Sequence, residues 1–513
     1  MSIGKVILVN KESFFGQSRI FLGVVLLTLF GLGLGIRLYD FKDPPLDFHP
    51  TRQLRSAIIA RGMYYRDSPT ADGWKRERAI DQLEGHDLIE PLIFESIVAK
   101  TYQLIGSEQL WVAHVYGSIF WLIGGLGLYL LASAMTNPDG GVIAIIYYLF
   151  LPFGVSASRS FQPDPLMVMG IILSLWALYR WYQKPTWGNT ILAGTLAGLT
   201  IFIKAVALFP ILPALAALIL VGKGLRTSIK DPQVWVLGTL TVLPALVYHI
   251  YGVYVLGSLS SQFEGRFFPE MWRDLGFYIN WFELARDIVG FAPIFIALLG
   301  VLLFRSAPLR AFGIALWVGY GLYGMTFSYH ITSHTYYHLP LIPIIALSLA
   351  PLAALVFQPL ISLRPIILIR IVVSGILLFG VLVNLWFVRL TLIREDYKNE
   401  PAFWENIGEL LGHNESVIAL TQDYGNRLAY FGWTTPKLWL TTGALNYREL
   451  KGRPPIEIQE WFEKKTGNKD FFLITMFNQL ENQPELKEIL YDNYEIYAQG
   501  DGYIVFDLRE LKK

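Results

Sequence analysis

The sequence predicts an α-helical polytopic membrane protein of about 11 transmembrane helices with a small soluble α/β domain at the C-terminus. Composition is the first observation: of 513 residues, 53% are hydrophobic and only 16% are charged. Soluble globular proteins are roughly 25% charged. The second is that apolar runs long enough to cross a bilayer recur along the chain, and the third is that hydropathy falls from about Arg394 onward.

Composition also excludes several classes of function. The net charge is only +1, so the chain has no broad basic field that would recruit nucleic acid through its phosphates. Cysteine is absent, which excludes disulfides, thiolate metal sites and a cysteine nucleophile. Any metal site would therefore have to use His, Asp or Glu.

The predicted helices begin with a hydrophobic stretch from Arg19 to Arg37. It lacks a small-residue cleavage site and can span about 30 Å of hydrocarbon, so we interpret it as a retained first helix and not as a signal peptide. Further apolar runs begin near Leu110, Gly140, Pro165, Thr190, Val206, Val234, Ile288, Ala311, Leu339 and Ile366. Together they predict about eleven crossings.

Basic residues in the short connections predict the orientation. They fall on the same side as the N-terminal Lys5, Lys11 and Arg19, and are Lys184, Lys223, Arg226, Lys230, Arg305, Arg310, Arg364 and Arg370. By the positive-inside rule that side is cytoplasmic. An odd number of crossings then places the long first loop and the C-terminal tail outside the cytoplasm, in what we expect to be a plasma (inner) membrane.

We therefore expect two domains. Residues 1–393 form the transmembrane domain, with a long first outer loop at about 39–108, and residues 394–513 form an extracytoplasmic α/β domain. The expected elements of the second domain are a helix near Ala402 to Leu411 and strands at Val417 to Leu420, Phe471 to Thr475 and Tyr503 to Phe506.

Polar groups at membrane depth are costly and usually functional, and here they gather on the outer side. Three carboxylates follow the first helix closely: Asp40, Asp43 and Asp47. They are placed for acid and base chemistry, although each is equally well explained as a charge that solvates a helix end. Asp47 is favoured as a functional residue because three polar residues follow it: His49, Arg52 and Gln53.

Two further outer positions follow the same logic. Arg159 and Asp164 lie in a tight link between two helices, close to the bilayer. Lys204 stands alone between two apolar runs. Lys204 is either a lysine that snorkels to the interface or a clamp for a phosphate group.

Three late histidines are spaced by four: His330, His334 and His338. On one helix they would share a face and could bind a metal ion. The following Leu339-Pro340 instead indicates a loop that enters a helix, and aromatic-rich boundaries are typical of membrane interfaces. A pocket lining is the favoured interpretation, and a divalent metal ion stays an open alternative.

This pattern resembles the GT-C superfamily, and within it the protein O-mannosyltransferase and lipid A aminoarabinose transferase group (glycosyltransferase family 39-like). The resemblance covers about the first 390 residues and rests on short motifs in a shared order. They are Asp47 in the first outer loop, Glu90-Pro-Leu-Ile, Pro163-Asp164, Ile203-Lys204-Ala205 and His334-Thr-Tyr-Tyr-His-Leu-Pro340. The chain departs from the family pattern after Asp47, where Phe-His-Pro replaces an acidic partner, and at Ala205, where the family has glycine.

The resemblance implies a glycosyltransferase (EC 2.4 class) that moves a sugar from a polyprenyl-phosphate donor to an acceptor hydroxyl on the outer face, with inversion. It implies that Asp47 is the catalytic base. It implies that Glu90 and Asp164 order the site, and that the residues that bind the donor phosphate or sugar are His49, Arg52, Gln53, Arg159, Lys204, His334, Tyr337 and His338. The expected partners are this donor, a lipid, glycan or protein acceptor, and membrane lipids.

Two other classes stay open. A transporter or flippase for a lipid-linked sugar or another anionic solute would place its charged sites near the bilayer midplane, often between internally repeated halves. The polar residues here gather at one surface and no internal repeat is visible. A membrane scaffold whose soluble domain does the work would leave the cluster of Asp, Arg and Lys unexplained.

Overall fold

The computed structural model describes residues 13–68, 73–86, 90–257, 259, 266–413 and 416–512. The chain forms two compact units. The first comprises Met1–Lys42, Asp87–Phe94 and Trp111–Glu395, and the second comprises Asp43–His86, Glu95–Leu110 and Asp396–Lys513. Most of the first loop is thus grouped with the C-terminal tail, whereas the expected division placed the loop with the transmembrane domain. Lys5 and Lys11 lie outside the described residues.

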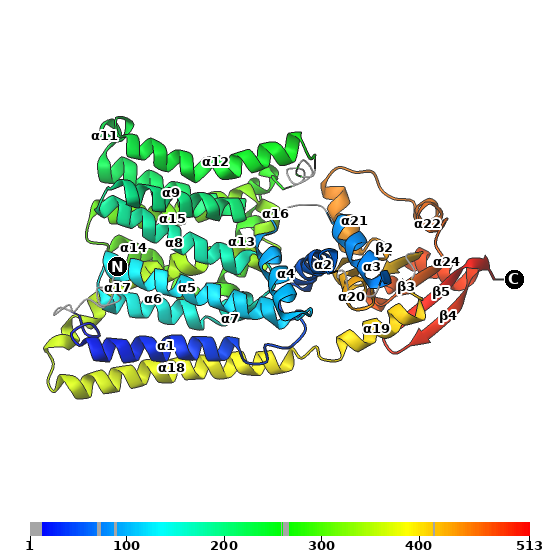
Figure 1. Cartoon of the computed structure of the whole chain (residues 1–513), viewed down its shortest axis with the longest axis horizontal. Helices are drawn as coiled ribbons and strands as arrows, with labels where there is room; N and C mark the ends of the chain where they lie inside the picture. The colour runs from blue at the N-terminus through cyan, green and yellow to red at the C-terminus, as the bar shows by residue number, and fades with distance from the viewer. Residues whose placement is uncertain are drawn as a thin grey trace. The chain divides into compact units, whose positions relative to one another are not determined.

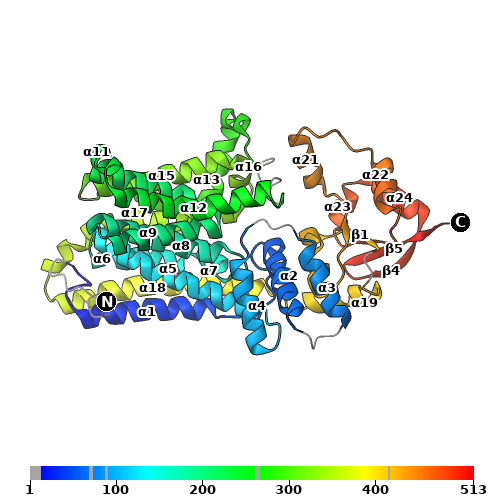
Figure 2. The ribbon, with the colours of Figure 1, turned by 45° about the horizontal axis from the view of Figure 1, so that its top comes forward.

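The first unit is helical, and its long helices lie side by side in one bundle (Figures 1 and 2). Its α-helices are α1 (Arg19–Arg37), α5 (Trp111–Met135), α6 (Pro138–Phe150), α7 (Pro152–Arg159), α8 (Asp164–Gln183), α9 (Trp187–Ile203), α10 (Leu208–Ala217), α11 (Leu225–Ile229), α12 (Pro232–Tyr254), α13 (Leu275–Val289), α14 (Phe291–Leu302), α15 (Ala307–Thr326), α16 (Ser328–Ile331), α17 (Leu341–Phe357) and α18 (Ile366–Arg394). Shorter helical turns are η2 (Ala205–Ala207), η3 (Leu218–Lys223), η5 (Pro269–Arg273), η6 (Thr335–His338) and η7 (Pro359–Ser362).

Local sequence explains where these helices begin and how closely they pack. The Asn137 side chain accepts hydrogen bonds from the backbone N–H groups of Asp139 and Gly140, at 3.0 and 3.1 Å, and so caps α6. Glycine permits the contact between α9 and α12, because a Cβ at Gly198 would lie 2.1 Å from the carbonyl oxygen of Leu240. Small residues at such crossings are typical of helices that pack within a membrane.

Among the described residues, seven helical segments are long and apolar enough to cross a membrane, or nine if each of two bent pairs is one span. The bent pairs are α6 with α7, at 64°, and α13 with α14, at 93°. The bundle also contains α9, which is apolar but has only 17 residues, and α15. The expected count of about eleven is reached only when these two helices are included. The predicted fold class, a helical multi-span membrane protein with a small C-terminal α/β domain, is confirmed.

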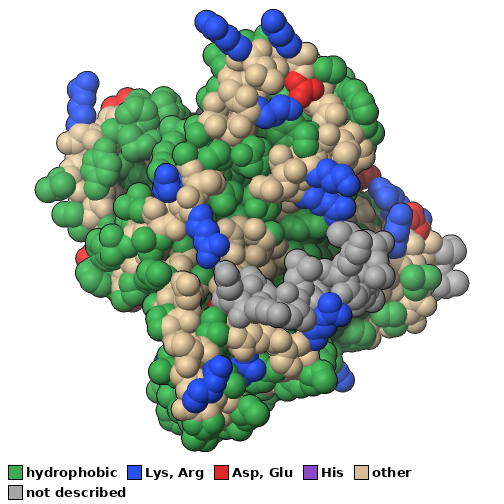
Figure 3. Space-filling model, turned by 90° about the vertical axis from the view of Figure 1, so that its left-hand side faces the viewer, with side chains coloured by type: hydrophobic (Ala, Val, Ile, Leu, Met, Phe, Trp, Pro, Cys, Tyr) green, Lys and Arg blue, Asp and Glu red, His purple; other side chains and the backbone are tan. Residues whose placement is uncertain are grey.

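One end of the bundle is basic. The face seen in Figure 3 carries many Lys and Arg side chains and few Asp or Glu side chains. The basic residues that the sequence assigns to one side follow or precede helix ends there: Lys184 follows α8, Lys223 ends η3, and Arg226 and Lys230 lie in and after α11. The first unit thus presents a basic face at one end of its bundle.

The second unit combines helices of the first loop with the C-terminal tail. The loop supplies α2 (Pro50–Arg66), α3 (Gly73–Glu84) and most of α4 (Ile93–Ile105). The tail contains α19 (Glu400–Leu410), β1 (Val417–Leu420), η8 (Gln422–Gly425), α20 (Asn426–Phe431), β2 (Lys437–Leu438), α21 (Thr442–Leu450), α22 (Ile458–Thr466), β3 (Phe471–Ile474), α23 (Phe477–Glu481), α24 (Pro484–Asn493), β4 (Tyr494–Gly500) and β5 (Tyr503–Leu511).

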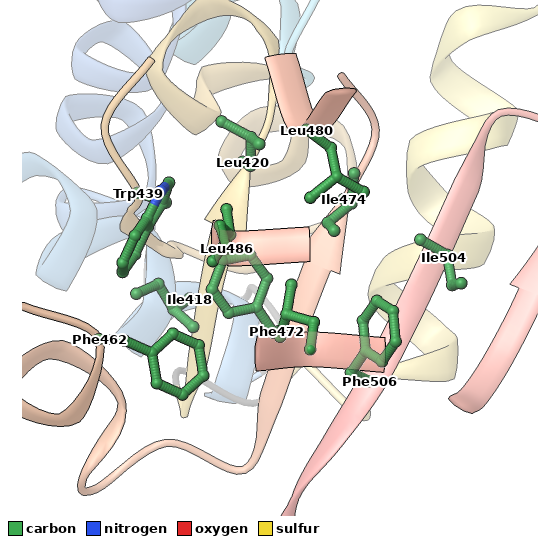
Figure 4. Close-up of a cluster of buried hydrophobic side chains, with 11 residues drawn as sticks. Ile418, Leu420, Trp439, Phe462, Phe472, Ile474, Leu480, Leu486, Ile504 and Phe506 are labelled. Atoms are coloured by element: carbon green, nitrogen blue, oxygen red, sulfur yellow. The ribbon is translucent and has the colours of Figure 1, made fainter. Parts of the chain in front are cut away.

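The tail folds around a five-stranded sheet of order β2-β1-β3-β5-β4. β1 pairs in parallel with β2 and β3, whereas β5 pairs antiparallel with β3 and β4. One face of the sheet is covered by a core that includes Ile418, Phe472 and Phe506 from the strands together with Trp439 and Phe462 (Figure 4). The helix and three strands that the sequence predicted are all present, with β5 longer than expected.

A cluster of three side chains joins the loop helices to the tail within this unit. Arg61 of α2 donates to the Glu108 carboxylate at 3.0 and 3.1 Å, and its guanidinium lies 3.7 Å from the centre of the Tyr430 ring. The Tyr430 hydroxyl in turn donates to Glu108. Burial raises the pKa of the Tyr430 hydroxyl well above its usual value, and the neighbouring Glu108 charge raises that pKa further. These contacts fix α2 against α20.

Candidate active site

Three charged residues from distant parts of the sequence meet in the first unit. Lys204 directly follows the last residue of α9, in an extended conformation that separates α9 from η2. Its Nζ atom donates to both carboxylate oxygens of Asp164, each at 2.8 Å, and lies 3.8 Å from Glu90. Asp164 opens α8, so all three groups are held at or beside helix ends.

This cluster is buried, with 7% of Lys204 and 1% of Asp164 exposed. A lysine that snorkels would extend its ammonium to water, whereas Lys204 directs it to Asp164. A buried charge needs a partner because removal from water costs several kcal/mol per ion. Asp164 is therefore what holds the Lys204 ammonium at this depth.

A cavity of about 240 Å³ lies beside Lys204. Glu90 and Lys204 line it together with three polar residues that the sequence did not single out as site residues: Tyr248, His249 and Arg266. Phe202, Phe267 and Phe327 supply apolar walls. Apolar walls with a few convergent polar groups are typical of a ligand site. Its position between the apolar runs that begin near Val234 and Ile288 was the one signal that could have identified Arg266.

The late histidines do not share one helix. α16 ends at Ile331, and Thr335 to His338 form a separate 3-10 turn. His338 is buried, and its Nε2 atom donates to the Ile331 carbonyl at 2.9 Å. Its Nδ1 atom therefore accepts from the Tyr320 hydroxyl, at 2.6 Å. Within the described residues, no group of three or more His, Asp or Glu side chains is arranged to hold a metal ion.

Aromatic stacking arranges the rest of this segment. The rings of His330 and His334 lie 5.3 Å apart, and His330 stacks on Tyr337 at 5.2 Å. Tyr336, which the sequence did not select, places its ring 5.6 Å from the Lys204 Nζ atom. The described lining of the Lys204 cavity does not include His334, Tyr337 or His338.

Arg159 lies elsewhere in the first unit. It ends α7, is buried, and donates from Nη2 to the carbonyl of Asp40 at 3.0 Å. The described lining of the Lys204 cavity does not include it either. Arg159 thus holds the chain where it leaves α1, at the start of the loop that leads to Asp47.

The remaining predicted residues belong to the second unit. Asp47 is partly exposed and accepts a hydrogen bond from Gln53 Nε2 at 3.2 Å. The same Gln53 atom donates to the Phe48 carbonyl at 2.8 Å, which closes a tight turn around Asp47. His49 precedes α2 with a positive φ of 48°, a conformation that is uncommon outside glycine. Backbone strain of this kind is concentrated at functional sites.

Residues of the C-terminal tail hold Thr51, which lies at the start of α2. The Thr51 hydroxyl donates to Asp423 at 3.1 Å, and Asn426 donates to the Thr51 carbonyl at 3.1 Å. Arg427 in turn donates to Asp423 at 2.5 Å. No sequence pattern predicted these partners, because about 370 residues separate the two segments and the contact exists only in the folded unit.

The arrangement of the histidines leads to a prediction about metal. If the protein performs the sugar transfer that its sequence leads us to expect, chelation should leave that transfer unchanged, because His338 uses both ring nitrogens within the protein. Transfer before and after treatment with EDTA, together with metal analysis, measures this. A divalent ion retained at near one equivalent, with activity lost on its removal, would contradict the prediction.

Comparison with known proteins finds a family match over part of the chain. Residues 90–251, which include Glu90, Asp164 and Lys204, match the family described as dolichyl-phosphate-mannose-protein mannosyltransferase. No curated protein sequence matches the chain.

Two solved structures share the fold along nearly the whole chain. ArnT from Cupriavidus metallidurans bound to undecaprenyl phosphate is 15% identical, with a TM-score of 0.56 over 95% of this chain and 97% of ArnT. The Archaeoglobus fulgidus oligosaccharyltransferase in complex with Zn and sulfate is 13% identical, with a TM-score of 0.55 over 94% of this chain and 73% of that protein. The resemblance predicted from the sequence is supported by the family match over residues 90–251 and by the shared fold. Residues 90–251 thus match this mannosyltransferase family, and the chain as a whole shares its fold with ArnT.

Proposed function

We propose that this enzyme transfers a sugar from a polyprenyl-phosphate donor to an acceptor hydroxyl on the outer face of the membrane, with inversion at the anomeric carbon. The observation that carries the proposal is the buried Lys204 ammonium, held by Asp164 at the wall of a cavity that Arg266 also lines. Support also comes from the matched family, whose description names a lipid-phosphate sugar, and from ArnT, which was solved with undecaprenyl phosphate.

The cavity can accept an anionic phosphate. Lys204 and Arg266 bring two positive charges to its wall, and Glu90 brings one negative charge. An ammonium has three N–H donors, and the Asp164 oxygens accept two, so the third can turn to a phosphate oxygen. Charge-assisted bonds of this kind stabilise the negative charge that develops on a leaving phosphate.

Asp47 is the proposed general base. As the acceptor oxygen forms its bond to the anomeric carbon, its proton passes to the Asp47 carboxylate. The bond from the anomeric carbon to the phosphate oxygen breaks on the opposite face, and its electron pair leaves with the polyprenyl phosphate. Gln53 supports Asp47 by donating a hydrogen bond to it. His49 and Arg52 are proposed to contact the donor from the same segment.

The proposed acceptor is a hydroxyl group of a lipid, a glycan or a protein. The late segment with His334, Tyr337 and His338 is proposed to shape the donor site. For His338 the proposed role is indirect, because its ring hydrogen-bonds to Tyr320 and to the Ile331 carbonyl. Arg159 likewise acts through the backbone that it holds at Asp40.

We also propose that the Lys204 end of the bundle and the C-terminal tail face outward from a plasma (inner) membrane. Lys184 lies before α9 and Lys204 after it, so the basic face and the Lys204 cluster belong to opposite ends of this helix. A reporter that is active only in the cytoplasm, fused after Lys513, should therefore stay silent. A strong cytoplasmic signal would reverse the orientation.

The second candidate function is transport of an intact lipid-linked sugar across the bilayer, without cleavage of the bond between sugar and phosphate. A transporter places its charged site near the midplane in broken helices, whereas Asp164 opens α8 and Lys204 directly follows the end of α9. The test uses purified protein in proteoliposomes with a polyprenyl-phosphate sugar that is labelled in the sugar. Label that passes to an acceptor hydroxyl with release of polyprenyl phosphate supports the proposal. Label that crosses the bilayer on an intact donor contradicts it.

A further inference from the structure

A second and larger apolar space lies in the first unit. Its volume is about 640 Å³, and it shares no lining residue with the Lys204 cavity. It lies where α6 meets α7 and where α13 meets α14, and its other walls are α17 and α18. Representative lining residues are Ile146, Phe150, Val289, Leu349, Leu377 and Gly380.

The space continues along the bundle. A neighbouring cavity of about 200 Å³ shares Ile146 and Leu377 with it and extends along α1 to Phe21 and Phe15. We call the two together the α18 groove. Ligand sites commonly measure about 300 to 1,000 Å³, and an apolar cavity of about 150 Å³ already binds benzene. The α18 groove is therefore long and large enough for an extended hydrocarbon chain.

The lining favours hydrocarbon over water. A buried water needs two to four polar partners. Among the described lining residues of the larger cavity, only Asp287 and Asn384 have charged or amide side chains. The helix break at Gly290 turns backbone groups toward this space, but the Val289 carbonyl already accepts a hydrogen bond from the Tyr147 hydroxyl at 2.7 Å. Backbone groups at membrane depth require such partners.

The sparse packing of α18 also favours a hydrocarbon chain in the groove. Only Val381, Val388 and Leu392 are buried among its 29 residues. Val388 and Leu392 pack against Ile36 and Val155 near the C-terminal end of the helix. The middle of α18, from Ile376 to Gly380, faces the groove and has little protein behind it. A hydrocarbon chain in the groove would supply the contacts that side chains do not.

We propose that the α18 groove binds an acyl chain of a zwitterionic bilayer phospholipid, at a site separate from the donor site, and that this lipid fixes α18 to the bundle. The head group is placed by a charged pair at the groove: the Asp287 carboxylate lines it and forms an ion pair with Arg286 at 2.8 Å. An ammonium and a phosphate on one head group complement that pair. The inference does not depend on the proposed sugar transfer.

The test compares two glycines of α18. At both Gly380 and Gly375, an added Cβ would meet no atom within 4 Å. Gly380 lines the groove, and the described lining does not include Gly375. The full chain is purified, given phosphatidylethanolamine with a diazirine in its acyl chain, irradiated, and its labelled peptides are mapped. We expect label on α6 and α18, loss of that label to background in Gly380→Phe, and its retention in Gly375→Phe.

The outcomes are separate from those of the transfer assay. Equal labelling of both variants, or none of the wild-type protein, would overturn the proposal. Stronger labelling of these helices by a diazirine-bearing polyprenyl phosphate would assign the groove to the donor and overturn the chosen occupant, and cross-links from a second copy of the chain would overturn it too. If Gly380→Phe does not fold, native mass spectrometry of the wild-type protein decides, since the proposal requires phosphatidylethanolamine to survive detergent washing and to raise Tm when added back.

Discussion

Replacing Asp47 by asparagine should lower sugar transfer by at least about 100-fold, the lower range for loss of a general base, while the protein stays folded and binds donor. An amide has nearly the size of a carboxylate, and its oxygen can still accept the hydrogen bond from Gln53. The turn around residue 47 should therefore survive, and the missing property is the ability to take a proton. Transfer by the purified variant is measured beside its donor affinity.

Two neighbouring carboxylates are the controls for Asp47. Asp43 is buried and lies 3.7 Å from the Lys398 ammonium, and the Asp40 backbone carbonyl accepts from Arg159. Asn variants at both positions should transfer sugar at close to the wild-type rate, because each of these residues makes a structural contact and neither is assigned a part in proton transfer. Near wild-type turnover in Asp47→Asn would remove Asp47 from the mechanism. A collapse confined to Asp40→Asn or Asp43→Asn would move the base to that residue.

Replacing Lys204 by glutamine should reduce transfer by about 100 to 1,000-fold, the cost of losing one donor to a developing oxyanion. It should also destabilise the protein by about 3 to 5 kcal/mol, because Asp164 would be left as a buried charge without its partner. Transfer and the thermal unfolding midpoint are both measured. The double variant Lys204→Gln, Asp164→Asn should recover much of the stability and none of the transfer.

Lys223 provides a matched control. It also ends a helical segment of the first unit and pairs with a carboxylate, that of Asp231, at the basic end of the bundle. Lys223→Gln should leave transfer unchanged within a few-fold, because Lys223 is not among the described residues that line the Lys204 cavity. Equal losses of transfer in the two variants would show that any broken ion pair disables the enzyme, and would withdraw the specific role of Lys204.

Elements whose signal is local could be predicted from sequence. The apolar stretch from Arg19 to Arg37 is α1 with the same bounds. The buried strands β1 and β3 are continuous apolar runs, as expected for central parallel strands. β2 has two residues and β4 is an exposed edge strand without a continuous apolar run, so neither was predicted. α9 and α10 are separated by the extended Lys204 and η2, a break that the sequence indicated through its lone lysine.

In the candidate site, too, local contacts could be predicted from sequence and long-range contacts could not. Gln53 lies near Asp47 in the chain, and the contact between them follows from that short separation. The meeting of Lys204 with Asp164 could be proposed only from the motif order, because 40 residues separate them. Arg266 and Asp423 belong to no motif, and Tyr336 lies within the late motif but was not selected as a site residue. Tertiary contacts alone bring these three residues to their sites. The late histidines share no single helical face, which was only the alternative that would favour a metal ion, because α16 ends at Ile331.

The central claim is that the Lys204 cavity binds the phosphate of a polyprenyl-phosphate donor. An experimental structure of the protein with bound polyprenyl phosphate tests it most directly. The account predicts phosphate density within hydrogen-bonding distance of the Lys204 Nζ atom, with Asp164 still bonded to that ammonium. Phosphate density at another site, with the Lys204 cavity unchanged and empty of lipid, would contradict it.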